Sequence, residues 1–255
     1  MIFPSSDISK HLKNFGLNES DTIMIHGDAG VAAQYIFDDC SDPISEFILH
    51  LFNYFHKGTV IVPTFTYSAT KGEVFDPSQT SSEIGQFSET FRKMKGVIRS
   101  CHPIFSVSCF GNQAEYFTDT KNTDCFGKDT FFDKLYTSNV KILALGCGLD
   151  RVTFLHFIEQ HLNVSYRYLK NFKAQIKNNK IIEETSVSYF VRKLDLDSNI
   201  DLSDFEKEAI RDDKLIKKPF GRFNTYLISS RDFFNISSKL IKQDEYALIH
   251  ESGHE

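Results

Sequence analysis

Residues 21–27 read DTIMIHG, a short apolar run that ends in glycine, and residues 59–66 read TVIVPTFT, a second run of the same kind. Between them, apolar residues recur at positions 44, 47, 48, 51, 52 and 55, which is the spacing of one helix face. A buried strand, a helix and a second buried strand within about 45 residues are typical of an α/β unit and allow a parallel sheet. This segment therefore predicts an α/β fold.

Further elements are predicted on both sides of this unit. Residues 7–15 favour a short helix that Gly16 ends, and the polar residues 67–82 favour an irregular insert. Near the C-terminus, residues 168–182 favour a β-hairpin that turns at Asn178 and Asn179. Because no repeat, low-complexity tract or linker interrupts the chain, we predict a single domain over residues 1–255 with a β-rich C-terminal portion. The other predicted elements are helices over 83–94 and 153–162, strands over 106–111, 140–146, 186–197 and 225–228, and a charged helix from residue 205.

The composition of the 255-residue chain excludes several classes of protein. A net charge of −5 argues against duplex nucleic acid or an anionic membrane as the main partner and suits an amine-bearing substrate. No apolar run approaches the ~20 residues that span a bilayer. Residues 1–6 show no basic stretch followed by an apolar one, so we do not expect a secretory signal. The five cysteines lack C-x-x-C spacing, which favours free thiols in a reducing cytoplasm over a zinc site.

The loop after the strand predicted at 140–146 is the first candidate site. Ligands of α/β folds gather beyond the carboxyl ends of strands, where helix N-termini offer free N–H groups. Thr153, His156 and Glu159 are spaced three apart, so they share one side of the following helix. A histidine with a carboxylate one turn away is a competent general base, and we expect Glu159 to fix its tautomer and raise its pKa. A surface His–Glu pair without function is the alternative that spacing alone favours.

A metal site on the same helix is rejected. His156, Glu159 and His161 do not have the spacing of a zinc-protease motif. His161 lies roughly 140° around the helix from His156, so these three side chains cannot converge on one ion.

Other polar loops are weaker candidates. Residues 99–106, RSCHPIFS, offer a cation, hydroxyls and an imidazole that suit a phosphate or a polar cofactor arm, although any polar loop can show them. The threonines of Pro63-Thr64-Phe65-Thr66 and the residues His26-Gly27-Asp28 also follow strands; for the threonines, β-propensity is the simpler reading. Cys147 is a potential nucleophile, but a small buried thiol is the plainer interpretation.

The order of these motifs resembles that of the aminoglycoside 3-N-acetyltransferase family. The resemblance covers roughly residues 15–170 and rests most on the block R-S-x-H-P-x-x-S at 99–106 and the later T-x-x-H-x-x-E at 153–159. It is carried as well by DTIMIH, GTVIVPTFT (58–66), FDP (75–77), GVIRS (96–100) and LALG (143–146).

The resemblance implies an α/β/α sandwich of the antibiotic N-acetyltransferase type and a cytoplasmic acyltransferase that uses acetyl-CoA and no metal. In that family pattern His156 would be the base that deprotonates the attacking amine, with Thr153 at the reaction centre and Glu159 orienting the imidazole. The CoA-binding residues carried over from the family motifs are His26, Gly27, Thr64, Thr66, Arg99, Ser100, His102, Pro103 and Ser106.

Departures from the family pattern bear on the acceptor. Gly27-Asp28-Ala29 stands where a small hydroxyl residue is usual, Arg151 follows Asp150, and the match fades beyond residue 170, in the region expected to shape the acceptor site (about 165–255). We therefore favour N-acylation of an amino sugar, with nucleotide-linked sugars included, and name Asp150, Arg192 and Asp195 as substrate residues. Aminoglycoside resistance is the alternative. A CoA-thioester hydrolase and a non-catalytic binding module are further readings, and the chain could form a homo-oligomer.

Overall fold

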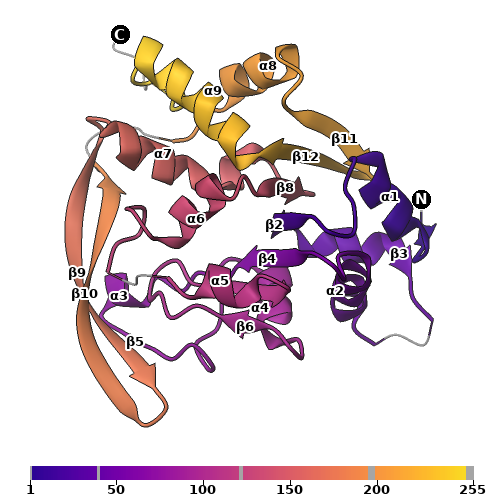
Figure 1. Cartoon of the computed structure of the whole chain (residues 1–255), viewed down its shortest axis with the longest axis horizontal. Coiled ribbons are helices and arrows are strands. Elements are labelled where there is room, and N and C mark those ends of the chain that lie inside the picture. The colour runs from indigo at the N-terminus through magenta and orange to yellow at the C-terminus, as the bar shows by residue number, and fades with distance from the viewer. Residues whose placement is uncertain (1, 39–40, 121–122, 195–198, 251–255) are drawn as a thin grey trace.

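The computed structural model describes residues 2–38, 41–120, 123–194 and 199–250. A seven-stranded sheet lies at the centre of the fold (Figure 1), with the strand order β11-β12-β8-β2-β4-β7-β6. Its strands are β2 (Thr22–Gly27), β4 (Thr59–Pro63), β6 (Ile98–Arg99), β7 (Val107–Gly111), β8 (Lys141–Leu145), β11 (Ile216–Phe220) and β12 (Phe223–Ser229).

The sheet is parallel only in the middle. β2 pairs in parallel with both β4 and β8, and α2 (Pro43–Tyr54) connects β2 to β4, as the strand–helix–strand pattern predicts. β12 and β7 run antiparallel to β8 and β4. The tight turn at Gly221, whose φ is +63°, returns the chain directly from β11 to β12, so no crossover helix intervenes there.

Helices cover both faces of the sheet, which confirms the predicted α/β/α sandwich. Successive residues of β2 alternate between the layers: Ile23 and Ile25 pack with the helices α1 (Asp7–Asn14), α2 and α4 (Gln86–Lys93), whereas Met24 packs on the opposite side. That second side is covered by α6 (Phe131–Thr137), α7 (Phe154–Leu162) and α9 (Ser230–Gln243), whose apolar residues form the larger core.

A long hairpin stands outside this sandwich, at the left of Figure 1. Its strands β9 (Arg167–Asn178) and β10 (Ile181–Arg192) pair along their whole length, and β9 also pairs with β5 (Val74–Phe75). The turn falls at Asn179 and Lys180, one residue beyond the predicted Asn178 and Asn179, because Asn178 still pairs with Ile181. The second strand takes in both the expected return and most of the alternating stretch 186–197. The C-terminal portion carries helices α8 (Ser203–Arg211) and α9 besides its strands.

Short elements complete the described chain. They are β1 (Phe3–Pro4), the 3-10 helices η1 (Ala29–Gln34) and η2 (Leu149–Arg151), β3 (Tyr35–Ile36), α3 (Ser68–Lys71) and α5 (Ala114–Thr118). The predicted insert 67–82 is mostly irregular around α3 and β5. Within the described ranges, no helix has the length and apolar character needed to cross a membrane.

Candidate functional site

The first cavity lies beyond the carboxyl ends of the central parallel strands and has a volume of about 830 Å³. His26 and Gly27 of β2, Pro63 of β4 and the loop that starts at Gly146 after β8 line it. Gly146 adopts a φ of +75°, and a Cβ there would lie 2.5 Å from Val31 Cγ2, so only glycine allows this turn. The cavity thus occupies the place where α/β folds bind ligands.

A second cavity of about 630 Å³ adjoins the first. Asp150 and Arg151 line both, so the two cavities meet at the loop that precedes α7. Thr153 lines the first cavity, and His156, one turn further along α7, lines the second. One helix therefore carries polar groups to both sides of the junction.

His156 and Glu159 are in direct contact. His156 Nδ1 lies 2.6 Å from Glu159 Oε2, and the side chain of Glu159 is fully buried while that of His156 is 16% exposed. Because an ionised carboxylate can only accept, this contact places the proton of the imidazole on Nδ1. The Nε2 atom then carries the lone pair, which is the form that a general base requires.

Two further residues, Tyr166 and Arg167, complete this buried group and were missed in the sequence analysis. Arg167 Nε lies 2.7 Å from Glu159 Oε2. Its Nη2 lies 2.9 Å from His156 Nδ1, but both nitrogens carry hydrogen in this tautomer, so this contact is not a hydrogen bond. The Tyr166 hydroxyl donates to Glu159 Oε1 at 3.1 Å. No periodic pattern marks either residue, because the turn at Asn163, with φ +53°, brings the start of β9 back against α7.

The pKa of His156 moves in the opposite direction to our expectation. Burial and the Arg167 guanidinium lower the pKa of His156, and together they outweigh the upward effect of Glu159. For Glu159, burial raises the pKa, but His156, Arg167 and Tyr166 stabilise the anion and the net direction is down. The pair is therefore a neutral imidazole beside a carboxylate at neutral pH.

His26 is a buried polar group on the wall of the first cavity. Burial lowers the pKa of His26 to about 4, so the ring is neutral, and its Nε2 has no hydrogen-bond partner in the described part of the chain. Gly27 also lines this cavity, and a Cβ at this position would lie 2.6 Å from the Phe87 ring. Both residues lie where the resemblance places CoA contacts.

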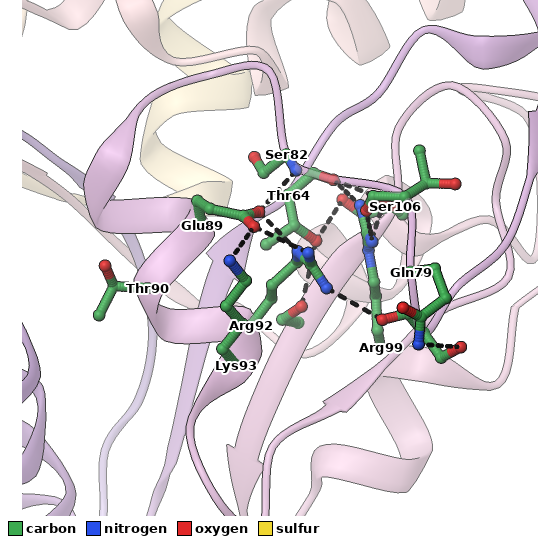
Figure 2. A network of polar contacts seen from close by, with 12 residues as sticks. Thr64, Gln79, Ser82, Glu89, Thr90, Arg92, Lys93, Arg99 and Ser106 are labelled. Carbon is green, nitrogen blue, oxygen red and sulfur yellow. Dashed lines mark hydrogen bonds and ion pairs between the residues drawn. The ribbon is translucent and has the colours of Figure 1, made fainter.

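Thr64, Arg99 and Ser106 are engaged with other parts of the protein (Figure 2). The Arg99 guanidinium donates to the carbonyl of Thr64 at 2.6 Å and to Ser106 Oγ at 3.2 Å. It also donates to the carbonyls of Pro77 and Thr80, which fastens the irregular insert to the end of β4. Burial lowers the pKa of Arg99 to about 10, which still leaves it charged at neutral pH.

The remaining residues carried over for CoA also bond within the protein. His102 Nδ1 accepts hydrogen bonds from two backbone N–H groups, Thr66 Oγ1 donates to the carbonyl of Pro103, and Ser100 Oγ accepts from the Val107 N–H. None of the seven residues Thr64, Thr66, Arg99, Ser100, His102, Pro103 and Ser106, all in the described part of the chain, is among those lining either cavity. Here they shape the loops around the first cavity.

The expected substrate residues fall at the second cavity where the structure describes them. Asp150 and Arg192 line it, and Asp195 lies outside the described residues. Cys147 lines the first cavity, and burial raises the pKa of its thiol to about 12, so the group is protonated at neutral pH. Among the described residues, no group of three or more His, Cys, Asp or Glu side chains is arranged to hold a metal ion.

Comparison with known proteins shows the family of the chain. The sequence model of the family "Aminoglycoside 3-N-acetyltransferase" matches residues 42–242, and the chain belongs to this family. It is 31% identical over 112 residues to aminoglycoside N(3)-acetyltransferase IV of Salmonella sp. (43% of this chain, 42% of the relative). It is 25% identical over 178 residues to aminoglycoside N(3)-acetyltransferase VII of Streptomyces paromomycinus (60% of this chain, 58% of the relative). The chain thus spans about half the length of the curated relatives that it matches.

Solved structures confirm the fold. The binary complex of AAC-IIIb with CoASH superposes with a TM-score of 0.79 over 94% of this chain and 97% of the other, at 19% identity. YokD from Bacillus subtilis gives a TM-score of 0.79 at 17% identity, over 96% of this chain and 95% of the other.

Proposed function

We propose that this chain is an acetyl-CoA-dependent N-acetyltransferase with His156 as the general base. The observation that carries the proposal is the position of His156 on the wall of the second cavity, close to its junction with the first, with Nδ1 bound to Glu159 and Nε2 left as the basic nitrogen. Two adjoining cavities suit a reaction in which donor and acceptor are held together. Such positioning supplies much of the rate enhancement of a direct transfer.

Acetyl-CoA fits the first cavity as the donor. The buried Nε2 of His26 lacks a protein partner at the wall of this cavity, and a neutral imidazole can donate to a carbonyl oxygen. Thr153, at the same cavity, is the N-cap residue of the nine-residue helix α7, so the N-terminal N–H groups of α7 lie nearby. The bound donor would supply an activated thioester, and a solved family relative with CoASH bound supports this assignment.

The proposed step starts with an acceptor amine in the second cavity. His156 Nε2 removes a proton as the amine nitrogen bonds to the thioester carbon, and Glu159 stabilises the imidazolium that forms. When the C–S bond breaks, His156 returns the proton to the leaving sulfur. The products are an amide and a free thiol, and a positioned histidine typically contributes ~10²–10⁴-fold to such a step.

For the acceptor, the names of the relatives support an aminoglycoside better than the nucleotide-linked amino sugar favoured by the sequence analysis. A complex of a histidine-to-alanine variant of the aminoglycoside acetyltransferase AAC(3)-IVa with a gentamicin points the same way. We accordingly place an amine of an amino-sugar ring in the second cavity. We further propose that the chain acts in the cytoplasm as a single domain.

A thiol-release assay with acetyl-CoA tests this function. The protein is incubated without acceptor, with gentamicin, and with a set of amino sugars and their nucleotide derivatives. Thiol release that requires an amine supports N-acetyl transfer. Release without any amine would instead indicate a thioester hydrolase, and CoA binding without release for every acceptor would indicate a binding module.

A further inference from the structure

The described residues that line the second cavity carry an excess of positive charge. Arg151, Arg167, Lys170 and Arg192 line it, and Asp150 is the single carboxylate among its described lining residues. The cavity of an enzyme that binds a polycation would be expected to show the reverse balance, because like charges repel.

Two of these cations are already paired. Arg167 is buried against Glu159, and Arg151 lies 3.4 Å from Asp150 at the entrance shared with the first cavity. Lys170 and Arg192 form no ion pair with a carboxylate of the described residues. Lys170 lies 5.0 Å above the Phe172 ring instead. Their charges are thus available to a ligand.

The hairpin presents Lys170 together with aromatic rings, and Arg192, which pairs with Arg167 at the end of β10, lines the same cavity. Tyr168, Lys170 and Phe172 alternate on β9, and Tyr189 and Val191 lie directly opposite Lys170 and Tyr168 on β10. In a β-hairpin, directly opposed residues point to the same face, and all five residues line the cavity. Aromatic faces beside cations suit a ring with an attached anion.

We propose that the second cavity recognises an acceptor amine that carries a phosphate-type anion, such as an amino sugar linked to a nucleoside diphosphate. This inference rests on the proposed acetyl transfer and specifies its substrate class from the charges of this chain's own cavity, in place of the aminoglycoside that the names of the relatives support. Lys170 and Arg192 bind the anion, and the rings of the hairpin pack on the sugar or the base. The amine then reaches His156, which lines the same cavity.

The phosphates of the donor are a second source of the same chemistry. We assign the anion at the second cavity to the acceptor and not to CoA. His156, the proposed base, lines this cavity, whereas Thr153 and His26 line the first cavity, where the donor is placed. The experiment therefore saturates the protein with CoA before the anion is added, so that the donor site is already filled.

Calorimetry with CoA-saturated protein tests the proposal, with pyrophosphate and UDP as probes. Lys170→Ala and Arg192→Ala each remove one cation, and Lys173→Ala is a matched control because Lys173 lies on β9 but does not line the cavity. We expect UDP to bind, and each cavity variant to weaken it about 10-fold or more, as for the loss of a charge-assisted contact. The affinity for CoA and the binding of UDP to Lys173→Ala should be unchanged.

Steady-state kinetics then separate this inference from the proposed function. UDP-glucosamine and gentamicin are compared as acceptors, and Lys170→Ala and Arg192→Ala should raise KM only for the first. Failure of UDP and pyrophosphate to bind the CoA-saturated protein, or weaker CoA with unchanged UDP binding in the variants, would overturn the anionic acceptor. Absence of acetyl transfer to every amine would overturn the proposed function, while the calorimetry would still decide whether the cavity binds the anion.

Discussion

Replacing Arg167 by glutamine removes a buried cation that contacts both members of the His156–Glu159 pair. Two unit charges 2.9 Å apart at an effective dielectric constant of about 20 repel by about 6 kcal/mol. Because both charges are delocalised, the distance between their centres is roughly 6 Å, and the repulsion at that distance is about 3 kcal/mol, which corresponds to about 2 pKa units. We therefore expect Arg167→Gln to raise the pKa of His156 by about 1–2 units from its lowered value.

The pKa of His156 can be followed by the NMR titration of its imidazole proton, assigned by comparison with His156→Ala. Arg167→Lys keeps the charge and should shift the pKa little. Glu159→Gln removes the carboxylate that raises the pKa, so it should shift the value further down. In pH profiles of kcat/KM measured with one acceptor, the apparent pKa of the acid limb should move in the same directions, up in Arg167→Gln and down in Glu159→Gln. An unchanged or lower pKa in Arg167→Gln would refute the electrostatic role assigned to this guanidinium.

Three other substitutions test the structure around the site. Arg99→Met should lower the free energy of unfolding by about 2–4 kcal/mol in urea titrations, because the carbonyls that Arg99 binds lose a buried donor. A loss of CoA affinity at unchanged stability would instead indicate that Arg99 contacts the cofactor directly. Gly111→Ala should lower the free energy of unfolding by about 2 kcal/mol or more, because the φ of Gly111 is +114° and a Cβ there would lie 2.3 Å from the Gly58 carbonyl oxygen. Stability equal to that of the wild type would show that the backbone relaxes at this turn without cost. Cys147→Ala should retain turnover to within about threefold in the thiol-release assay because the thiol is protonated at neutral pH, and a 100-fold loss would assign it a catalytic role.

The sequence predicted the middle of the fold better than its edges. Buried strands and helix stripes are local patterns, and they located β2, α2, β4, β8 and α7 to within a few residues. The direction of β7 and β12 depends on pairing between distant segments, for which no local pattern exists. The length of the β9–β10 hairpin was underestimated because the strand predicted over 186–197 was not joined to it, and no local pattern shows which segments pair.

The candidate site shows the same limit. The spacing of His156 and Glu159 on one helix predicted their contact, because helical geometry is fixed by sequence separation. Arg167 is eight positions beyond Glu159 in another element, and its arrival depends on the turn at Asn163. The expected upward shift in the pKa of His156 was wrong because burial and Arg167 are tertiary effects. For the same reason, sequence alone did not show that Arg99 and Ser106 bond to each other and to the end of β4.

The role of His156 is the central claim, and one comparison tests it most directly. Thiol release from acetyl-CoA with a productive amine is measured for the wild type and for His156→Ala, together with the calorimetric affinity of both proteins for CoA. We predict a loss of turnover of about 10²–10⁴-fold with CoA affinity nearly unchanged, because His156 lines the acceptor cavity and not the donor cavity. Turnover near the wild-type rate, or a parallel loss of CoA binding, would contradict this account.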